Sequence, residues 1–159
     1  MSKVCIVTGA SQGLGRGIAH VLATEEEAKV YATARNLDLL KQLAEDVAKS
    51  KGEIIPYRLD QNDDKSSADF VNMVADKEAG IDLLVNSSYG GLTAMTPYFG
   101  KPFWERPISV FDASINIGLR SAYVMSSLVS LHMVNRGSGL LVQVSSLGGY
   151  HYLFDVGYG

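Results

Sequence analysis

The chain has 159 residues, enough for one domain with a substantial apolar core and too few for two domains of ordinary size. Apolar residues make up 47% and charged residues 19%, which excludes a disordered chain and a membrane-embedded one. The formal net charge of -3 and the lack of a basic patch argue against a nucleic-acid partner. The one cysteine, Cys5, has no disulfide partner and no metal-ligand spacing, so we expect no metal.

No signal-peptide pattern and no apolar run of membrane-spanning length is visible at the start of the chain or within it. A single unpaired cysteine fits a reducing compartment. The default expectation is therefore a cytoplasmic protein, and association with an organelle such as the endoplasmic reticulum stays open.

Short β-branched runs alternate with segments whose apolar residues recur every three or four positions. The expected strands are Val4 to Val7, Lys29 to Thr33, Glu53 to Leu59, Ile81 to Val85 and Leu140 to Val144. Most of these are nearly continuous apolar runs, as parallel strands covered on both faces require. Right-handed crossovers leave few other topologies. We therefore predict an α/β fold: a Rossmann-type parallel sheet with helices on both faces.

Helices are expected to begin near Leu14, Leu37, Ser67 and Ser109. Their apolar stripes predict the core side chains, which are Ile18, Val21 and Leu22, then Leu40, Leu43 and Val47, then Phe70, Met73 and Val74, and finally Phe111, Ile115 and Leu119. A long irregular stretch is expected from Ser87 to about Pro107. Because it follows the fourth strand, it would lie at the sheet edge where ligands bind.

A glycine-rich turn directly follows the first strand and opens into a helix. It runs Thr8, Gly9, Ala10, Ser11, Gln12, Gly13, Leu14 and Gly15. Glycines there permit a tight turn and close approach of pyrophosphate, and the helix start supplies free N–H groups. No Lys-Ser or Lys-Thr pair follows, which excludes a P-loop. We predict dinucleotide binding by Thr8, Gly9, Ser11, Gln12, Gly13, Leu14 and Gly15.

The spacing Gly-x-x-x-Gly-x-Gly after Thr8 resembles the signature of the classical short-chain dehydrogenases/reductases. The resemblance continues along the chain at Asp60, Asn86, Asn116, Ser145, Ser146 and Tyr158. It implies that Asp60 contacts adenine and that Asn86 belongs to the cofactor site. One stretch departs from the pattern, since Ser87, Ser88 and Tyr89 stand where the family has Asn-Ala-Gly. These three residues stay unassigned.

The residue that follows the second strand bears on the choice of cofactor. NAD sites place a carboxylate there for the ribose hydroxyls, whereas this chain has Ala34 and then Arg35. An arginine can bind a 2′-phosphate through bidentate, charge-assisted hydrogen bonds, and Ser11 could donate another. The alternative is a solvated arginine ahead of a helix. We predict NADP as the cofactor, ahead of NAD.

The family resemblance also implies a catalytic set. Ser145 precedes Tyr158 by thirteen positions, the family spacing, so Ser145 would orient the substrate oxygen and Tyr158 would deliver the proton. Asn116 lies where the family has its proton-relay asparagine. Taken without the family, the serines terminate a strand, Tyr158 is a packing residue and Asn116 bonds to backbone. The implied reaction interconverts a small-molecule carbonyl and alcohol, and the family fold implies a homo-oligomer.

The family motif reads Tyr-x-x-x-Lys, and the sequence ends at Gly159, before the lysine position. An ammonium group near a tyrosine lowers the phenol pKa from about 10. We therefore expect residues 1–159 to be the N-terminal portion of a single NAD(P)-binding domain whose C-terminal strands are missing. The expected full-length protein is an NADP(H)-dependent oxidoreductase. The alternative is a catalytically inactive, truncated nucleotide-binding module.

Overall fold

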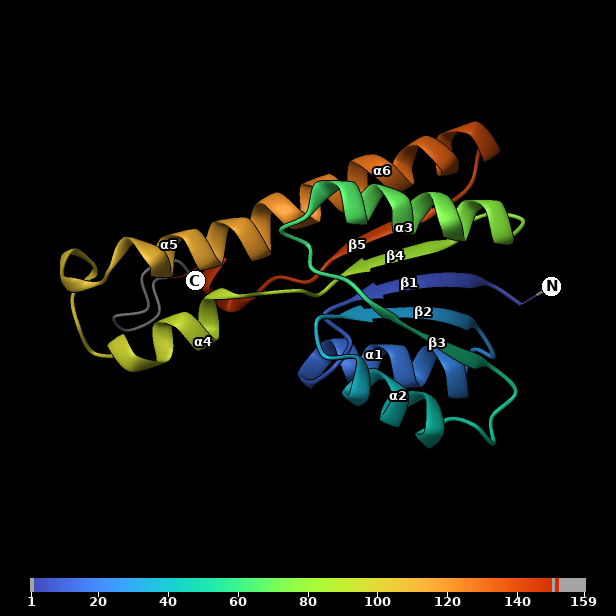
Figure 1. Ribbon diagram of the computed structural model, residues 1–159, viewed down its shortest axis with the longest axis horizontal. Coiled ribbons are helices and arrows are strands. Elements are labelled where there is room, and N and C mark those ends of the chain that lie inside the picture. Colours follow the sequence, from blue (N-terminus) through green and yellow to red (C-terminus); the bar gives the residue numbers. More distant parts are fainter. Residues whose placement is uncertain (1, 150, 152–159) are drawn as a thin grey trace.

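The structure is a computed structural model that describes residues 2–149 and 151. Within these residues, five parallel strands form one sheet in the order β3-β2-β1-β4-β5 (Figure 1). The strands are β1 Val4–Thr8, β2 Lys29–Ala34, β3 Glu53–Arg58, β4 Leu83–Asn86 and β5 Leu140–Gln143. Every strand predicted from the sequence is confirmed, although β4 begins two residues later than expected. The α/β fold class is therefore confirmed.

Helices cover both faces of the sheet, as the apolar strands require. In Figure 1, α1 Gly13–Thr24 and α2 Leu37–Asp46 lie on one face, and α3 Asp64–Lys77 and α6 Ser121–Arg136 lie on the other. Side chains alternate along β1, so Cys5 packs with α1 and α2, and Ile6 packs with α3 and α6. Burial raises the pKa of the Cys5 thiol to about 11.

The predicted core of α2 and α3 is confirmed, whereas that of α1 is wrong at one position. Leu40, Leu43 and Val47 are buried, as are Phe70 and Val74, with Met73 packed beside them. Val21 of α1 is 44% exposed. The buried side of α1 consists instead of small residues, Gly15, Ala19 and Ala23. Small side chains let this helix lie close to the sheet, so Ile18 and Leu22 flank the contact and Val21 points away from it.

The fourth predicted stripe is wrong at Phe111 and Leu119, whereas Ile115 is half-buried, and the helix that follows residue 107 is not regular. It consists of α5 Ile108–Ser114, a π-helical segment Ile115–Arg120 and α6. Ile117, with φ −106° and ψ 50°, breaks the helical geometry and shifts the phase of the face that follows. Within α5, before the break, the buried positions are Val110 and Ser114, and Phe111 is 38% exposed. After the break Leu119 is 69% exposed and Met125 is buried.

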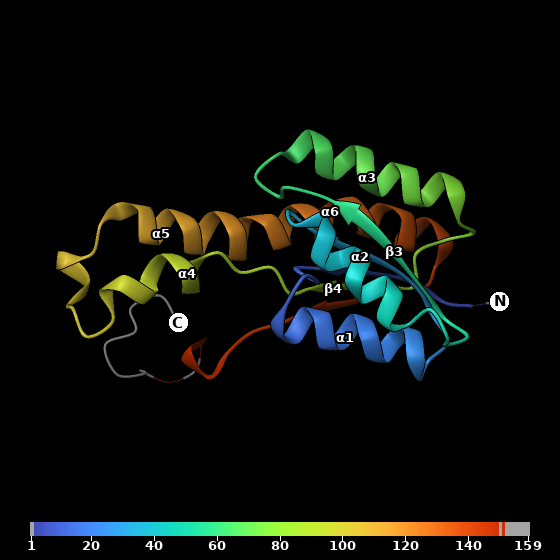
Figure 2. The same cartoon turned by 60° about the horizontal axis from the view of Figure 1, so that its bottom comes forward.

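The stretch between β4 and α5 is more ordered than the expected loop from Ser87 to Pro107. It contains the short helix α4 Gly91–Met95 and two 3-10 turns, η1 Thr96–Tyr98 and η2 Phe103–Glu105. In both views α4 and α5 project beyond the carboxyl ends of the strands (Figure 2). The guanidinium of Arg106 closes the far turn by donating from Nε and Nη2 to the Lys101 carbonyl, at 3.0 and 2.7 Å.

Candidate functional site

The glycine turn lies at the carboxyl end of β1, between the strand and α1. Gly9 has φ +67°, and a Cβ there would lie 2.9 Å from the Ser87 carbonyl oxygen and the Ser88 nitrogen. Gly13 has φ +56°, and a Cβ there would meet no heavy atom within 4 Å. Gly9 therefore lets the turn pack against the backbone that follows β4, and Gly13 leaves open space in front of α1.

The start of α1 is the natural position for a phosphate. Gln12 is extended and its side chain does not cap the helix, so the first N–H groups of α1 are left available. A Cβ on Gly15 would lie 2.5 Å from the Gly9 carbonyl oxygen, so only glycine lets the helix approach the turn so closely. Gln12, Gly13 and Leu14 are exposed and Ser11 is partly exposed. Unpaired N–H groups, the positive end of the helix dipole and open space at Gly13 fit a pyrophosphate.

Thr8 supports this turn from beneath. Its side chain is fully buried, and Oγ1 accepts hydrogen bonds from the Ser87 and Ser88 nitrogens at 3.1 and 3.4 Å. The structure therefore gives Thr8 a contact with the chain that follows β4, 79 positions away, and it also gives Ser87 and Ser88 a role that the sequence left unassigned.

Asn86, at the end of β4, faces away from the turn. Its side chain is 3% exposed, and Nδ2 donates to the Ser126 hydroxyl at 2.9 Å and to the Ala122 carbonyl at 3.4 Å. Its Oδ1 is buried without a hydrogen-bond partner among the described residues. This asparagine joins the sheet to α6, the helix that follows the Asn116 position.

Arg35 and Asp60 follow β2 and β3 at the same carboxyl edge. Arg35 is exposed, and its guanidinium forms no ion pair or hydrogen bond with the described residues, whereas the next residue, Asn36, caps α2 through Oδ1. Asp60 is exposed, and its Oδ1 accepts from the Asn62 backbone and side-chain nitrogens at 3.0 and 3.1 Å. Since β2 lies beside β1, Arg35 flanks the glycine turn and is free to bind an anion.

The structure places the catalytic candidates only in part. Ser145 is exposed two residues after β5, and β5 pairs with β4 so that Gln143 lies beside Asn86. Asn116 is exposed in the π-helical segment. Tyr158 lies outside the described residues, so the predicted pairing of Ser145 with Tyr158 stays a prediction.

An ion pair that the sequence did not reveal anchors the C-terminal end of the π-helical segment, at Arg120. Arg120 donates from Nη1 and Nη2 to the two carboxylate oxygens of Asp64 at 2.7 and 2.6 Å. These hydrogen bonds hold the pKa of Asp64 below its ordinary value. The pair joins the start of α3 to the start of α6, near the Asn116 position. Its partners are 56 residues apart, which no sequence motif indicates.

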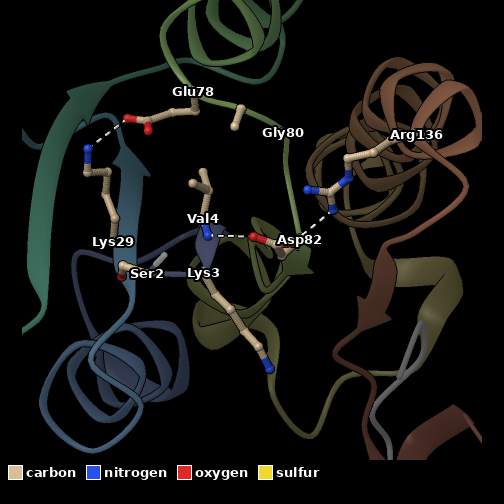
Figure 3. Close-up of a pocket in the computed structure, with 9 residues that line it drawn as sticks. Ser2, Lys3, Val4, Lys29, Glu78, Gly80, Asp82 and Arg136 are labelled. Carbon is tan, nitrogen blue, oxygen red and sulfur yellow. Dashed lines mark hydrogen bonds and ion pairs between the residues drawn. The ribbon is translucent and has the colours of Figure 1, made fainter.

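The opposite, amino edge of the sheet has a hollow of about 430 Å³, and four of the charged side chains that line it form two ion pairs (Figure 3). Lys29 binds Glu78 at 3.0 Å, and Arg136 binds Asp82 at 2.8 Å. Burial alone would raise the pKa of Glu78, but hydrogen bonds from Tyr31 and Lys29 outweigh it and hold that pKa below its ordinary value. These ion pairs link the C-terminal ends of α3 and α6 to the sheet, so we interpret them as structural.

No cluster of three or more His, Cys, Asp or Glu side chains suited to a metal ion occurs among the described residues. In that same part of the chain, none of the helices combines the length and hydropathy that crossing a membrane demands.

Comparison with known proteins agrees with this geometry. A family model for short chain dehydrogenase matches residues 3–159. Over 158 residues the chain is 40% identical to dehydrogenase/reductase SDR family member 1 of Mus musculus, covering 99% of this chain and 50% of that protein. The chain thus spans about half the length of this relative.

Solved structures show the same fold. A metagenomic short-chain oxidoreductase in complex with NADP superimposes with a TM-score of 0.85 at 28% identity, covering 96% of this chain and 66% of that one. A 7α-hydroxysteroid dehydrogenase complexed with NADH and 7-oxo glycochenodeoxycholic acid gives a TM-score of 0.83 at 25% identity, covering 96% and 56%. With a family match along residues 3–159, this chain belongs to the short-chain dehydrogenase family.

Proposed function

We propose that this chain carries the NADP(H)-binding part of an oxidoreductase that interconverts a carbonyl and an alcohol. The observation that carries the proposal is an uncapped helix start, opened by Gly13, beside the exposed Arg35, which has no ion-pair partner in the part of the chain that the structure describes. The relatives bear dehydrogenase and reductase names, and structures of this fold hold nicotinamide cofactors.

The pyrophosphate would lie on the N–H groups at the start of α1, between Gly9 and Gly15. Asp60 has one carboxylate oxygen in its own turn and would contact the adenine with the other. The similar structures hold NADP in one case and NADH in the other, so they do not choose between the two. Arg35 favours NADP, because a guanidinium forms stronger hydrogen bonds with a 2′-phosphate than with a neutral ribose hydroxyl.

The nicotinamide supplies or accepts a hydride when it is bound. Ser145 would hold the substrate oxygen in line through its hydroxyl, and Tyr158 would give or take the proton at that oxygen. Asn116 would belong to the proton relay. These three roles, a small carbonyl or alcohol as substrate, and homo-oligomeric assembly are carried over from the family and are part of the proposal.

The cofactor assignment is tested by Arg35→Ala. Loss of a charge-assisted hydrogen bond costs about 1.5–3 kcal/mol, so we expect the Kd for NADPH to rise roughly 10- to 100-fold and the Kd for NADH to change little. Titration of NADPH and NADH fluorescence measures both constants.

Lys49→Ala is the matched control. Lys49 is exposed beyond the far end of α2, so its loss removes the same charge away from the carboxyl edge. Equal weakening of NADPH and NADH by Arg35→Ala would reject the 2′-phosphate assignment. If neither dinucleotide binds the unaltered chain, the proposed function itself is wrong.

A further inference from the structure

We propose that Tyr89 is a positioning residue that holds the π-helical segment Ile115–Arg120, and with it Asn116, against the chain that follows β4. The proposal rests on the proposed function in one respect, which is the role of Asn116 at the site. Tyr89 stands in the stretch where the sequence departs from the family pattern, and that pattern assigns it no role.

The π-helical segment needs an external support. Ile117 breaks the helical geometry between α5 and α6, so the hydrogen-bond ladder of a regular helix is interrupted there. The Ile117 carbonyl oxygen accepts instead from the Gly90 nitrogen at 2.8 Å. The residue next to Tyr89 therefore satisfies the backbone group that lies beside Asn116.

The hydroxyl of Tyr89 adds a second contact. It lies 3.3 Å from Ser114 Oγ, and Ser114 Oγ donates its proton to the Val110 carbonyl at 2.9 Å. Because the serine proton is used in this way, the Tyr89 hydroxyl is the donor of the bond between the two side chains. Tyr89 thereby binds the last turn of α5, directly before the π-helical segment.

The ring of Tyr89 makes the third contact, and glycines make room for it. A Cβ on Gly118 would lie 3.1 Å from the ring, and a Cβ on Gly91 would overlap the Tyr89 hydroxyl and Ser114 Oγ. The ring thus lies over the segment on the C-terminal side of Asn116. Tyr89 is 48% exposed, so its contacts do not come from burial in the core.

The same stretch of chain reaches the cofactor turn. The Ser87 and Ser88 nitrogens bind Thr8, and Gly9 lies against their backbone. Four consecutive residues, 87–90, therefore touch the glycine turn at one end and the π-helical segment at the other. A displacement of the turn on cofactor binding would be passed to Asn116 through Tyr89 and Gly90.

The test follows the side-chain amide of Asn116 by ¹⁵N NMR, with its signals assigned by their loss in Asn116→Asp. In the unliganded chain we expect Tyr89→Ala to move these signals and to speed hydrogen exchange of the Gly90 amide at least tenfold. Tyr89→Phe keeps the ring over Gly118. In this variant we expect the Asn116 signals and the Gly90 exchange rate to lie close to those of the unaltered chain. Tyr123→Ala, at a 75% exposed tyrosine of α6, is the control and should change neither.

NADPH addition supplies a second readout. We expect the cofactor to shift the Asn116 signals in the unaltered chain, and we expect this shift to disappear in Tyr89→Ala while the Kd for NADPH changes less than threefold.

Asn116 signals that stay in place in Tyr89→Ala, with and without NADPH, would overturn the proposal. If Tyr89→Ala does not fold, Gly118→Ala replaces it, since its methyl would lie 3.1 Å from the ring and requires the ring to give way by a few tenths of an ångström, and a shift of the Asn116 signals is again required. Failure of NADPH to bind any variant counts against the proposed function, and the unliganded comparison still decides the role of Tyr89.

Discussion

Gly15→Ala isolates the close approach of α1 to the glycine turn. Gly15 and Gly17 lie two positions apart in the same helix, and only their surroundings differ. A Cβ on Gly15 would lie 2.5 Å from the Gly9 carbonyl oxygen and 3.0 Å from its carbon, whereas a Cβ on Gly17 would meet nothing within 4 Å. Comparing the two alanine variants therefore removes the common effect of helix propensity.

The size of the effect follows from these contacts. Replacing glycine by alanine inside a helix stabilises it by roughly 0.5–1 kcal/mol, which is the change we expect for Gly17→Ala. Gly15→Ala has the same gain, but its methyl group overlaps backbone atoms that cannot rotate away, and such overpacking costs about 1–3 kcal/mol. The difference in unfolding free energy between the two variants should therefore be about 1–3 kcal/mol, with Gly15→Ala the less stable.

Urea denaturation followed by circular dichroism measures this difference, and NADPH fluorescence titration measures its effect on the site. Because the overlap moves the start of α1 away from the turn, we expect Gly15→Ala to weaken NADPH binding about tenfold or more and Gly17→Ala to leave it unchanged. Equal stability and equal NADPH affinity of the two variants would refute the close approach of helix and turn.

Two further predictions concern the scaffold. Leu40→Ala removes a fully buried side chain and should lower the unfolding free energy by about 2–5 kcal/mol, whereas Val21→Ala at an exposed position should change it by about 0.5 kcal/mol or less, as urea denaturation will show. Hydrogen bonds hold the pKa of Glu78 below 4.5 and that of Asp82 below 3.8, so their stabilising effect is present above these values and is lost as pH falls through the folded-state pKa values. Stability measured against pH should fall on the acid side, and a Glu78→Gln variant with the same acid dependence would contradict this reasoning.

Local patterns in the sequence were sufficient to predict the sheet and the glycine turn. Apolar runs such as Val4 to Val7 have no polar face, so only a strand covered on both sides can bury them. The glycine spacing from Gly9 to Gly15 is likewise local, because it depends only on one strand, the turn that follows it and the start of the next helix. The sequence also placed Arg35 at the end of β2, since a strand end is visible in the change from β-branched to polar residues.

The tertiary structure alone decided how distant segments meet. The π-helical break at Ile117 rotates the helix face that follows it, so a periodicity that assumes one continuous helix put Leu119 in the core, where it does not lie. Thr8 binds the backbone of Ser87, and Arg120 binds Asp64, across 79 and 56 residues respectively. The physical reason is that hydrophobic periodicity describes each element by itself, whereas such contacts depend on strand register and helix phase, which are set when the elements pack together.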